Sequence, residues 1–72
     1  MNKTVAIRGE FVKLSALLKF TNLCASGGEA GIRIANGEVL VNGEICRMRG
    51  KKIKPGDEVR MGDVTLLIRL EP

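Results

Sequence analysis

The sequence predicts an α+β fold in which two short helices pack on a small, mostly antiparallel sheet. Three observations predict it: apolar residues alternate at both ends of the chain, two helical stretches lie between them, the second bounded by caps, and Asn42-Gly43 is a hairpin signal. With 72 residues, residues 1–72 are expected to form one domain, which buries only about 60% of the surface exposed in the unfolded chain.

The first half of the chain predicts one strand and one helix. Thr4–Arg8 alternates apolar and more polar residues, as a short strand does, and Gly9-Glu10 interrupts the pattern. Phe11–Leu23 has the spacing of an amphipathic helix, strongest over Leu14–Thr21. The residues expected on its buried face are Phe11, Leu14, Leu17 and Leu18.

A second, shorter helix is bounded by recognisable caps. Ser26 followed by Glu29 forms a capping box, in which each side chain satisfies a backbone N–H at the helix start. The helix is expected to continue to Ala35. Asn36-Gly37 then ends it, because glycine adopts the left-handed backbone of a helix C-terminus without a Cβ clash.

The second half predicts a hairpin followed by two more strands. Val39–Val41 is a short apolar strand, Asn42-Gly43 suits a type I′ turn, and Glu44–Cys46 is the return strand. Pro55–Asp57 is a turn by composition. The remaining strands are expected at Glu58–Met61 and at Val64–Leu70, the latter paired with the N-terminal strand.

Basic residues gather between the hairpin and the Pro55 turn. The chain has twelve Lys and Arg against eight Asp and Glu, a net charge of +4. Five of the twelve lie between Arg47 and Lys54, with no acidic residue among them. We call Arg47–Lys52 the basic loop, in which Met48 is expected to be an apolar anchor and after which Ile53 enters the core. Such clustering indicates nucleic-acid binding, although a solvated loop is the simpler structural interpretation.

Several kinds of chemistry are disfavoured by the residues present. The chain has no His, which excludes Ser-His and Cys-His nucleophiles, and the acidic residues fall at caps, turns and strand edges. We therefore expect no enzymatic activity and no cofactor. Cys24 and Cys46 are too few for a disulfide scaffold or a zinc site, and both are expected to be reduced thiols. With no signal peptide and no membrane-length apolar stretch, a cytoplasmic protein without membrane contact is expected.

The order of these motifs resembles the S-four-type RNA-binding domain, named after ribosomal small-subunit protein four and also called the αL motif. The resemblance covers Lys13 to about Val59, and it is closest to small stand-alone bacterial members that carry an added N-terminal strand. The matching features are Lys13-Leu14, Ser26 with Ala30, the run Gly37-Glu38-Val39-Leu40-Val41-Asn42-Gly43, and Gly56-Asp57.

The resemblance implies that the partner is structured RNA, either ribosomal or transfer RNA. It also implies that the protein is a monomer, with the ribosome as an expected site of action. Many relatives have a basic residue where this chain has Gly27 and Gly31, which leaves the basic loop to compensate. With two aromatic residues in the chain, RNA is expected to be recognised by shape. The expected RNA-binding residues are Lys13, Arg33, Arg47, Arg49, Lys51 and Lys52. The alternative function is a protein-interaction adaptor for an acidic partner, aided by exposed Leu40 or Leu67.

Overall fold

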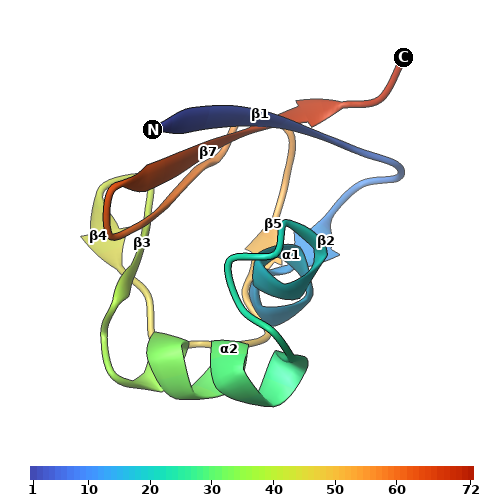
Figure 1. Cartoon of the computed structure of the whole chain (residues 1–72). Helices are drawn as coiled ribbons and strands as arrows, with labels where there is room; N and C mark the ends of the chain where they lie inside the picture. The colour runs from blue at the N-terminus through green and yellow to red at the C-terminus, as the bar shows by residue number, and fades with distance from the viewer.

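The computed structural model describes residues 1–72 and confirms the α+β class (Figure 1). The chain forms seven strands and two helices, and the two helices follow each other directly. In order they are β1 (Asn2–Ile7), β2 (Val12–Lys13), α1 (Leu14–Phe20), α2 (Gly27–Ala35), β3 (Val39–Val41), β4 (Glu44–Ile45), β5 (Lys52–Ile53), β6 (Glu58–Met61) and β7 (Val64–Leu70).

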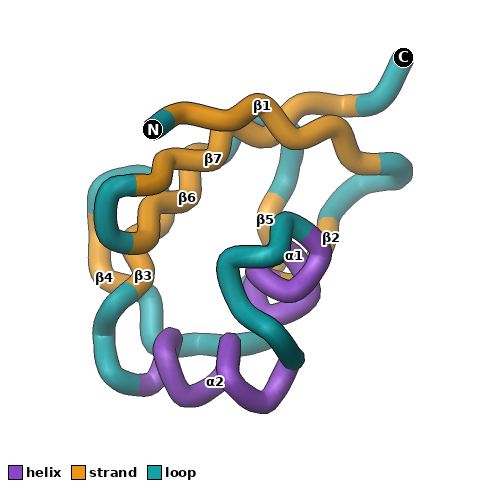
Figure 2. Tube along the Cα trace, viewed as in Figure 1, coloured by secondary structure: helices purple, strands orange, loops and turns teal.

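Five strands form a curved sheet in the order β1-β7-β6-β3-β4. Every pair in it is antiparallel except β1 with β7, which run parallel with Asn2 beside Thr65 and Ile7 beside Leu70. The predicted pairing of the last strand with the N-terminal strand is thus confirmed. Both helices lie on the concave side of the sheet (Figure 2), and β2 pairs with β5 in a separate two-stranded ladder.

A single apolar cluster joins the sheet to the helices. It contains 14 buried residues, none of them polar or charged. Ile53 is completely buried, as its place after the basic loop predicted. Besides Ile53, the members are Val5, Ile7, Leu14, Leu17, Leu18, Cys24, Ala30, Ile34, Val39, Val41, Val59, Leu66 and Ile68. Burial of these side chains is the main force that holds two such short helices in place.

The prediction that the first helix begins at Phe11 is wrong. Val12 and Lys13 are extended and pair with β5, so α1 begins only at Leu14. Phe11 therefore lies outside the helix and is 40% exposed. Pairing with a strand distant in sequence overrides the helical spacing of Phe11, which a local pattern cannot reveal.

The caps of α2 agree with the sequence in all but one contact. The Ser26 hydroxyl accepts a hydrogen bond from the Glu29 N–H at 3.1 Å. The Glu29 carboxylate accepts from the N–H of Ala25 at 3.4 Å, where the capping box predicted the N–H of Ser26. Gly37 has φ +78 and ends the helix as predicted, with its N–H bonded to the Ile34 carbonyl at 3.0 Å.

The hairpin turn is bonded to the Pro55 turn by side chains. Asn42 and Gly43 both have positive φ, 52 and 85, as the type I′ prediction requires. The Asn42 amide donates to the Asp57 carboxylate at 3.1 Å and accepts from the Glu58 N–H at 2.9 Å. Asp57 also accepts from the Lys54 N–H at 2.8 Å. Chiefly this backbone donor, together with the Asn42 amide, holds the pKa of Asp57 below its ordinary value, although partial burial opposes the shift.

Both cysteines are free, which confirms the prediction of unbridged thiols. Cys24 is buried in the core, and this burial is the main reason that its thiol pKa is raised, with the negative charge of Glu29 adding to the shift. Neither α1 nor α2 is long and apolar enough to span a bilayer.

Candidate nucleic-acid interface

The basic loop is fixed by its backbone, and this attachment also caps α1. The N–H groups of Leu14 and Ser15 donate to the carbonyls of Lys51 and Arg49 at 2.9 and 3.1 Å. Helix starts have unpaired N–H groups that usually need a side-chain acceptor, but Lys13 at the N-cap provides none. The loop carbonyls therefore cap the helix, and the same bonds hold the loop against the start of α1.

The expectation that Met48 anchors the loop is wrong, because its side chain is 67% exposed. A bond between the Lys51 N–H and the Met48 carbonyl, 3.1 Å long, closes the tip of the loop instead. At the other end, the Cys46 N–H donates to the Val39 carbonyl at 2.9 Å. Since backbone groups make these attachments, none of them depends on a charged side chain, and the basic residues of the loop are all exposed.

Two lysines face each other where β2 meets β5. Lys13 and Lys52 are direct partners in the antiparallel register, and both are exposed. Like charges in this arrangement repel and destabilise the pair of strands. Lys52 is also 4.9 Å from the centroid of the Phe11 ring, a cation–π contact that restrains its side chain.

Four of the six predicted RNA-binding residues thus come together at the start of α1. The backbone contacts join Lys13 to Lys52 and bring Arg49 and Lys51 alongside. All four side chains are exposed, and none makes an ion pair, because the chain's ion pairs involve Arg8 and Arg33. We call this set the basic cluster: Lys13, Arg49, Lys51 and Lys52.

The other two predicted residues lie apart from the basic cluster. Arg33 pairs with Glu38 at 3.3 Å and with Glu29 at 3.7 Å, so carboxylates already neutralise its charge. Arg47 extends over the C-terminal end of α2, where a Cβ on Gly37 would lie 2.8 Å from its guanidinium. A cation is favourable there, since helix carbonyls point outward at that end.

Arg49 belongs to the loop but reaches α2. Its Nη2 donates to the carbonyl of Gly27 at 3.4 Å, 22 residues away in the sequence. Figure 1 shows the segment after β4 running alongside α2 before it rises to β5. The basic loop consequently connects both helices.

Sequence reasoning missed two residues that shape this region. Phe11 was assigned to a helix face, and Asn42 only to a turn. The available signal for Phe11 was its position two residues before Lys13, which puts both on one face if the segment is extended. The bonds of Asn42 to Asp57 and Glu58 had no comparable local signal.

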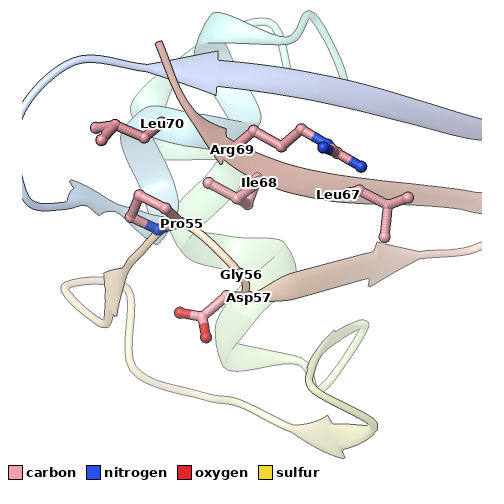
Figure 3. Close-up of a pocket in the computed structure, with 7 residues that line it drawn as sticks. All are labelled: Pro55, Gly56, Asp57, Leu67, Ile68, Arg69 and Leu70. Carbon is pink, nitrogen blue, oxygen red and sulfur yellow. The ribbon is translucent and has the colours of Figure 1, made fainter. Parts of the chain in front are cut away.

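The largest surface hollow lies elsewhere, between β7 and the Pro55 turn (Figure 3). Its volume is about 500 Å³, and its charged lining residues are Asp57 and Arg69. The Asp57 carboxylate points away from the Arg69 guanidinium and is already bonded to Asn42 and to the Lys54 N–H. No group of three or more metal-ligating side chains occurs in the structure.

A two-helix α+β module with an acid-free basic loop has the features of a nucleic-acid-binding domain. Comparison with known families gives the class directly: residues 5–69 match the S4 domain, and the chain belongs to that family. This confirms the resemblance noted from the motifs, and it indicates an RNA-related function.

The chain is also similar to a curated protein of Bacillus subtilis (strain 168), described as a probable ribosome maturation protein RlbA. The two are 36% identical over 61 residues, which cover 85% of this chain and 86% of the relative. The similarity therefore extends over nearly the whole length of both proteins.

Proposed function

We propose that residues 1–72 act as one non-enzymatic domain that binds structured RNA through the basic cluster, assisted by Arg47. Exposed Lys and Arg side chains can contact phosphates, and the loop can also reach 2′-hydroxyl groups across a shallow minor groove. Arg33 has a smaller part in this proposal, because Glu29 and Glu38 already neutralise it. The protein needs no cofactor and works as a cytoplasmic monomer.

The observation that carries this proposal is the cost of the charge arrangement to the fold. Lys13 and Lys52 are opposite each other, Lys51 is adjacent, and no acidic side chain pairs with them. A small domain gains no stability from such repulsion. A polyanionic partner accounts for the arrangement, since binding to phosphates removes the repulsion.

Ribosomal RNA is the structured RNA that we favour. The support is the Bacillus subtilis relative, described as a probable ribosome maturation protein, to which the chain is similar over most of its length. We propose that this chain also associates with ribosomal particles, and that transfer RNA is the second candidate ligand. Sedimentation of the tagged protein with ribosomal particles from a bacterial lysate tests this association.

A direct test measures binding to purified ribosomal RNA, to transfer RNA and to polyuridylate as an unstructured control. The site variant reverses Arg49, Lys51 and Lys52 to Glu, and the matched variant reverses Lys3, Arg60 and Arg69 to Glu. Three reversals lower the net charge by 6, from +4 to −2, in both variants. The matched residues are exposed and lie on β1, β6 and β7, away from the basic loop.

We expect the site variant to lose binding and the matched variant to retain most of it, with both still folded. If the four residues of the basic cluster each neutralise one phosphate, log affinity falls against log salt with a slope of about −3 to −4. Equal loss in the two variants would mean that net charge alone attracts RNA, and the proposed site would be wrong.

The adaptor alternative has one supporting observation. Ile45 and Met48 are 55% and 67% exposed and line a hollow of about 390 Å³ beside Arg47. Leu40 and Leu67, expected to be its apolar contacts, are only partly exposed. If the protein binds none of the three purified RNAs but still sediments with ribosomal particles, it is an adaptor.

A further inference from the structure

The guanidinium of Arg49 occupies a space on α2 that only a glycine leaves open. A Cβ placed on Gly31 would lie 3.0 Å from Nη1 and 3.1 Å from Cζ of Arg49, closer than such contacts normally are. Gly27 is one helical turn away on the same flank, and its carbonyl accepts the Arg49 hydrogen bond at 3.4 Å. Gly27 and Gly31 together therefore form a bare strip of helix beneath the arginine.

No backbone requirement explains a glycine at position 31. Gly31 lies in the middle of α2 without a positive φ, where glycine is less favourable than alanine by about 0.5–1 kcal/mol. The atoms nearest to its absent Cβ all belong to the flexible side chain of Arg49, and none to another backbone. The fold would therefore accept alanine, and the consequence would be displacement of Arg49.

Gly37 shows the contrast. A Cβ there would lie 2.8 Å from Arg47 Nη2, but Gly37 also has φ +78 at the end of the helix. Glycine is required at position 37 for the backbone whether or not Arg47 lies over it. Gly31, in contrast, contacts an arginine without being required by the backbone conformation, so a substitution there tests the contact alone.

Contact with the helix prepares Arg49 for binding. A free arginine side chain loses considerable rotamer entropy when it is immobilised, and pre-organisation before binding reduces that loss. One of the guanidinium N–H groups is bonded to Gly27, while the others have no protein partner and remain available. Their planar fork suits two oxygens of a single phosphate.

We propose that Gly31 is a positioning residue, which holds Arg49 on α2 so that its guanidinium meets an RNA phosphate there. The basic loop thereby supplies a cation to the flank of α2 that carries Gly31. The basic residue of α2 itself, Arg33, projects about 200° around the helix axis from Gly31 and cannot serve that flank. This inference rests on the proposed RNA-binding function.

The test is Gly31→Ala, with Gly28→Ala as the matched control and purified ribosomal RNA as the probe. A Cβ on Gly28 would meet only the Ser26 hydroxyl, at an ordinary 3.7 Å. Both variants replace glycine by alanine within α2, so the melting temperature is expected to stay level or rise in each. RNA affinity is expected to fall about three- to tenfold in Gly31→Ala, from the usual gain of ordering one long side chain, and to stay unchanged in Gly28→Ala.

Arg49→Ala separates this inference from the function on which it rests. In that background Gly31→Ala should cause no further loss of affinity, because the two residues act through one contact. If Arg49→Ala weakens binding and Gly31→Ala does not, the positioning role is wrong and the RNA-binding site stands. If neither Arg49→Ala nor the reversal of Arg49, Lys51 and Lys52 weakens binding, the proposed function itself fails.

Discussion

Two neighbouring regions of this protein are attached to the fold in different ways. Asn42, Gly43, Asp57 and Glu58, which we call the Asn42 junction, are joined by one backbone bond, from the Asn42 N–H to the Glu58 carbonyl at 2.8 Å, and by side chains. One amide and one carboxylate bond the two turns together. The basic loop is joined mainly by backbone N–H and carbonyl groups. Of its charged side chains, only Arg49 is hydrogen-bonded to the fold, at Gly27, and none makes an ion pair. The junction therefore uses its side chains for stability, whereas the loop leaves its side chains for a ligand.

This difference leads to separate consequences for substitution. At the junction, a change of side chain removes bonds that close the fold, and unfolding should become easier. In the loop, the same backbone bonds persist whatever side chain is present, and changes should alter binding. Substitutions at the two regions test that separation, and the largest effect is expected at Asn42.

Asn42→Ala should lower the free energy of unfolding by about 2–3 kcal/mol. Two hydrogen bonds are lost, each of about 1 kcal/mol, and alanine is strained at positive φ. Urea denaturation measures the loss, and Asn42→Gly separates its parts, because glycine keeps φ +52 available without strain. RNA affinity of the folded variant should stay unchanged. A large loss of affinity with little loss of stability would break the comparison.

Asp57 makes the junction sensitive to acid. Because the Lys54 N–H and the Asn42 amide stabilise the carboxylate, its pKa in the folded protein is below the ordinary 3.8, and the unfolded chain binds the proton more readily. The stabilisation is therefore fully present above pH 3.8 and is lost as the pH falls through the lower, folded pKa.

The measurement compares wild type with Asp57→Asn across this pH range. The variant should be less stable by about 1 kcal/mol at neutral pH, the value of a typical hydrogen bond, and the difference should shrink as the pH falls below 3.8 and through the lower, folded pKa. Arg49→Ala, from the basic loop, should differ from wild type by an amount that stays constant across this pH range, because Arg49 is not among the groups that lower the Asp57 pKa. A difference that stays constant with pH would show that charge on Asp57 has no part in holding the junction.

Much of the fold was predictable because its signals are local. The Ser26 cap, the Gly37 stop and the Asn42-Gly43 turn each depend on residues that are adjacent or nearly so, and all three are confirmed. The start of α1 was not predictable in this way. Lys13 becomes a strand residue because Lys52, 39 positions later, pairs with it, and no local pattern carries that information.

The candidate site divides along the same line. Composition was enough to find the basic loop, since its four cations, followed by Lys54 and without an acid among them, are visible in the sequence. The contacts of the cations could not be predicted from composition. Arg49 reaches Gly27 and Gly31 across the fold, and Arg33 of α2 is paired with Glu29 and Glu38. Charge can be counted in a sequence, but the partner of each charge depends on tertiary contacts.

The smallest expected effect lies at the Lys13 and Lys52 pair, and it has the opposite sign to those at the junction. Removing either cation relieves a direct cross-strand repulsion, so Lys13→Ala should raise the free energy of unfolding by a few tenths of a kcal/mol at low salt. The gain should vanish by about 1 M salt, where screening acts within roughly 3 Å. In the same variant, the slope of log affinity for ribosomal RNA against log salt should become less steep by about 0.7–0.9, the share of one phosphate contact.

Lys13→Ala is the cleaner choice, because Lys52 also contacts the Phe11 ring at 4.9 Å and its removal would lose that cation–π interaction. Phe11→Leu provides the control, since it keeps an apolar side chain at position 11 and removes only the ring. If Lys13→Ala instead destabilises the protein at every salt concentration, Lys13 contributes to the fold. The distinction between a junction that stabilises the fold and a basic loop that binds RNA would then not hold for Lys13.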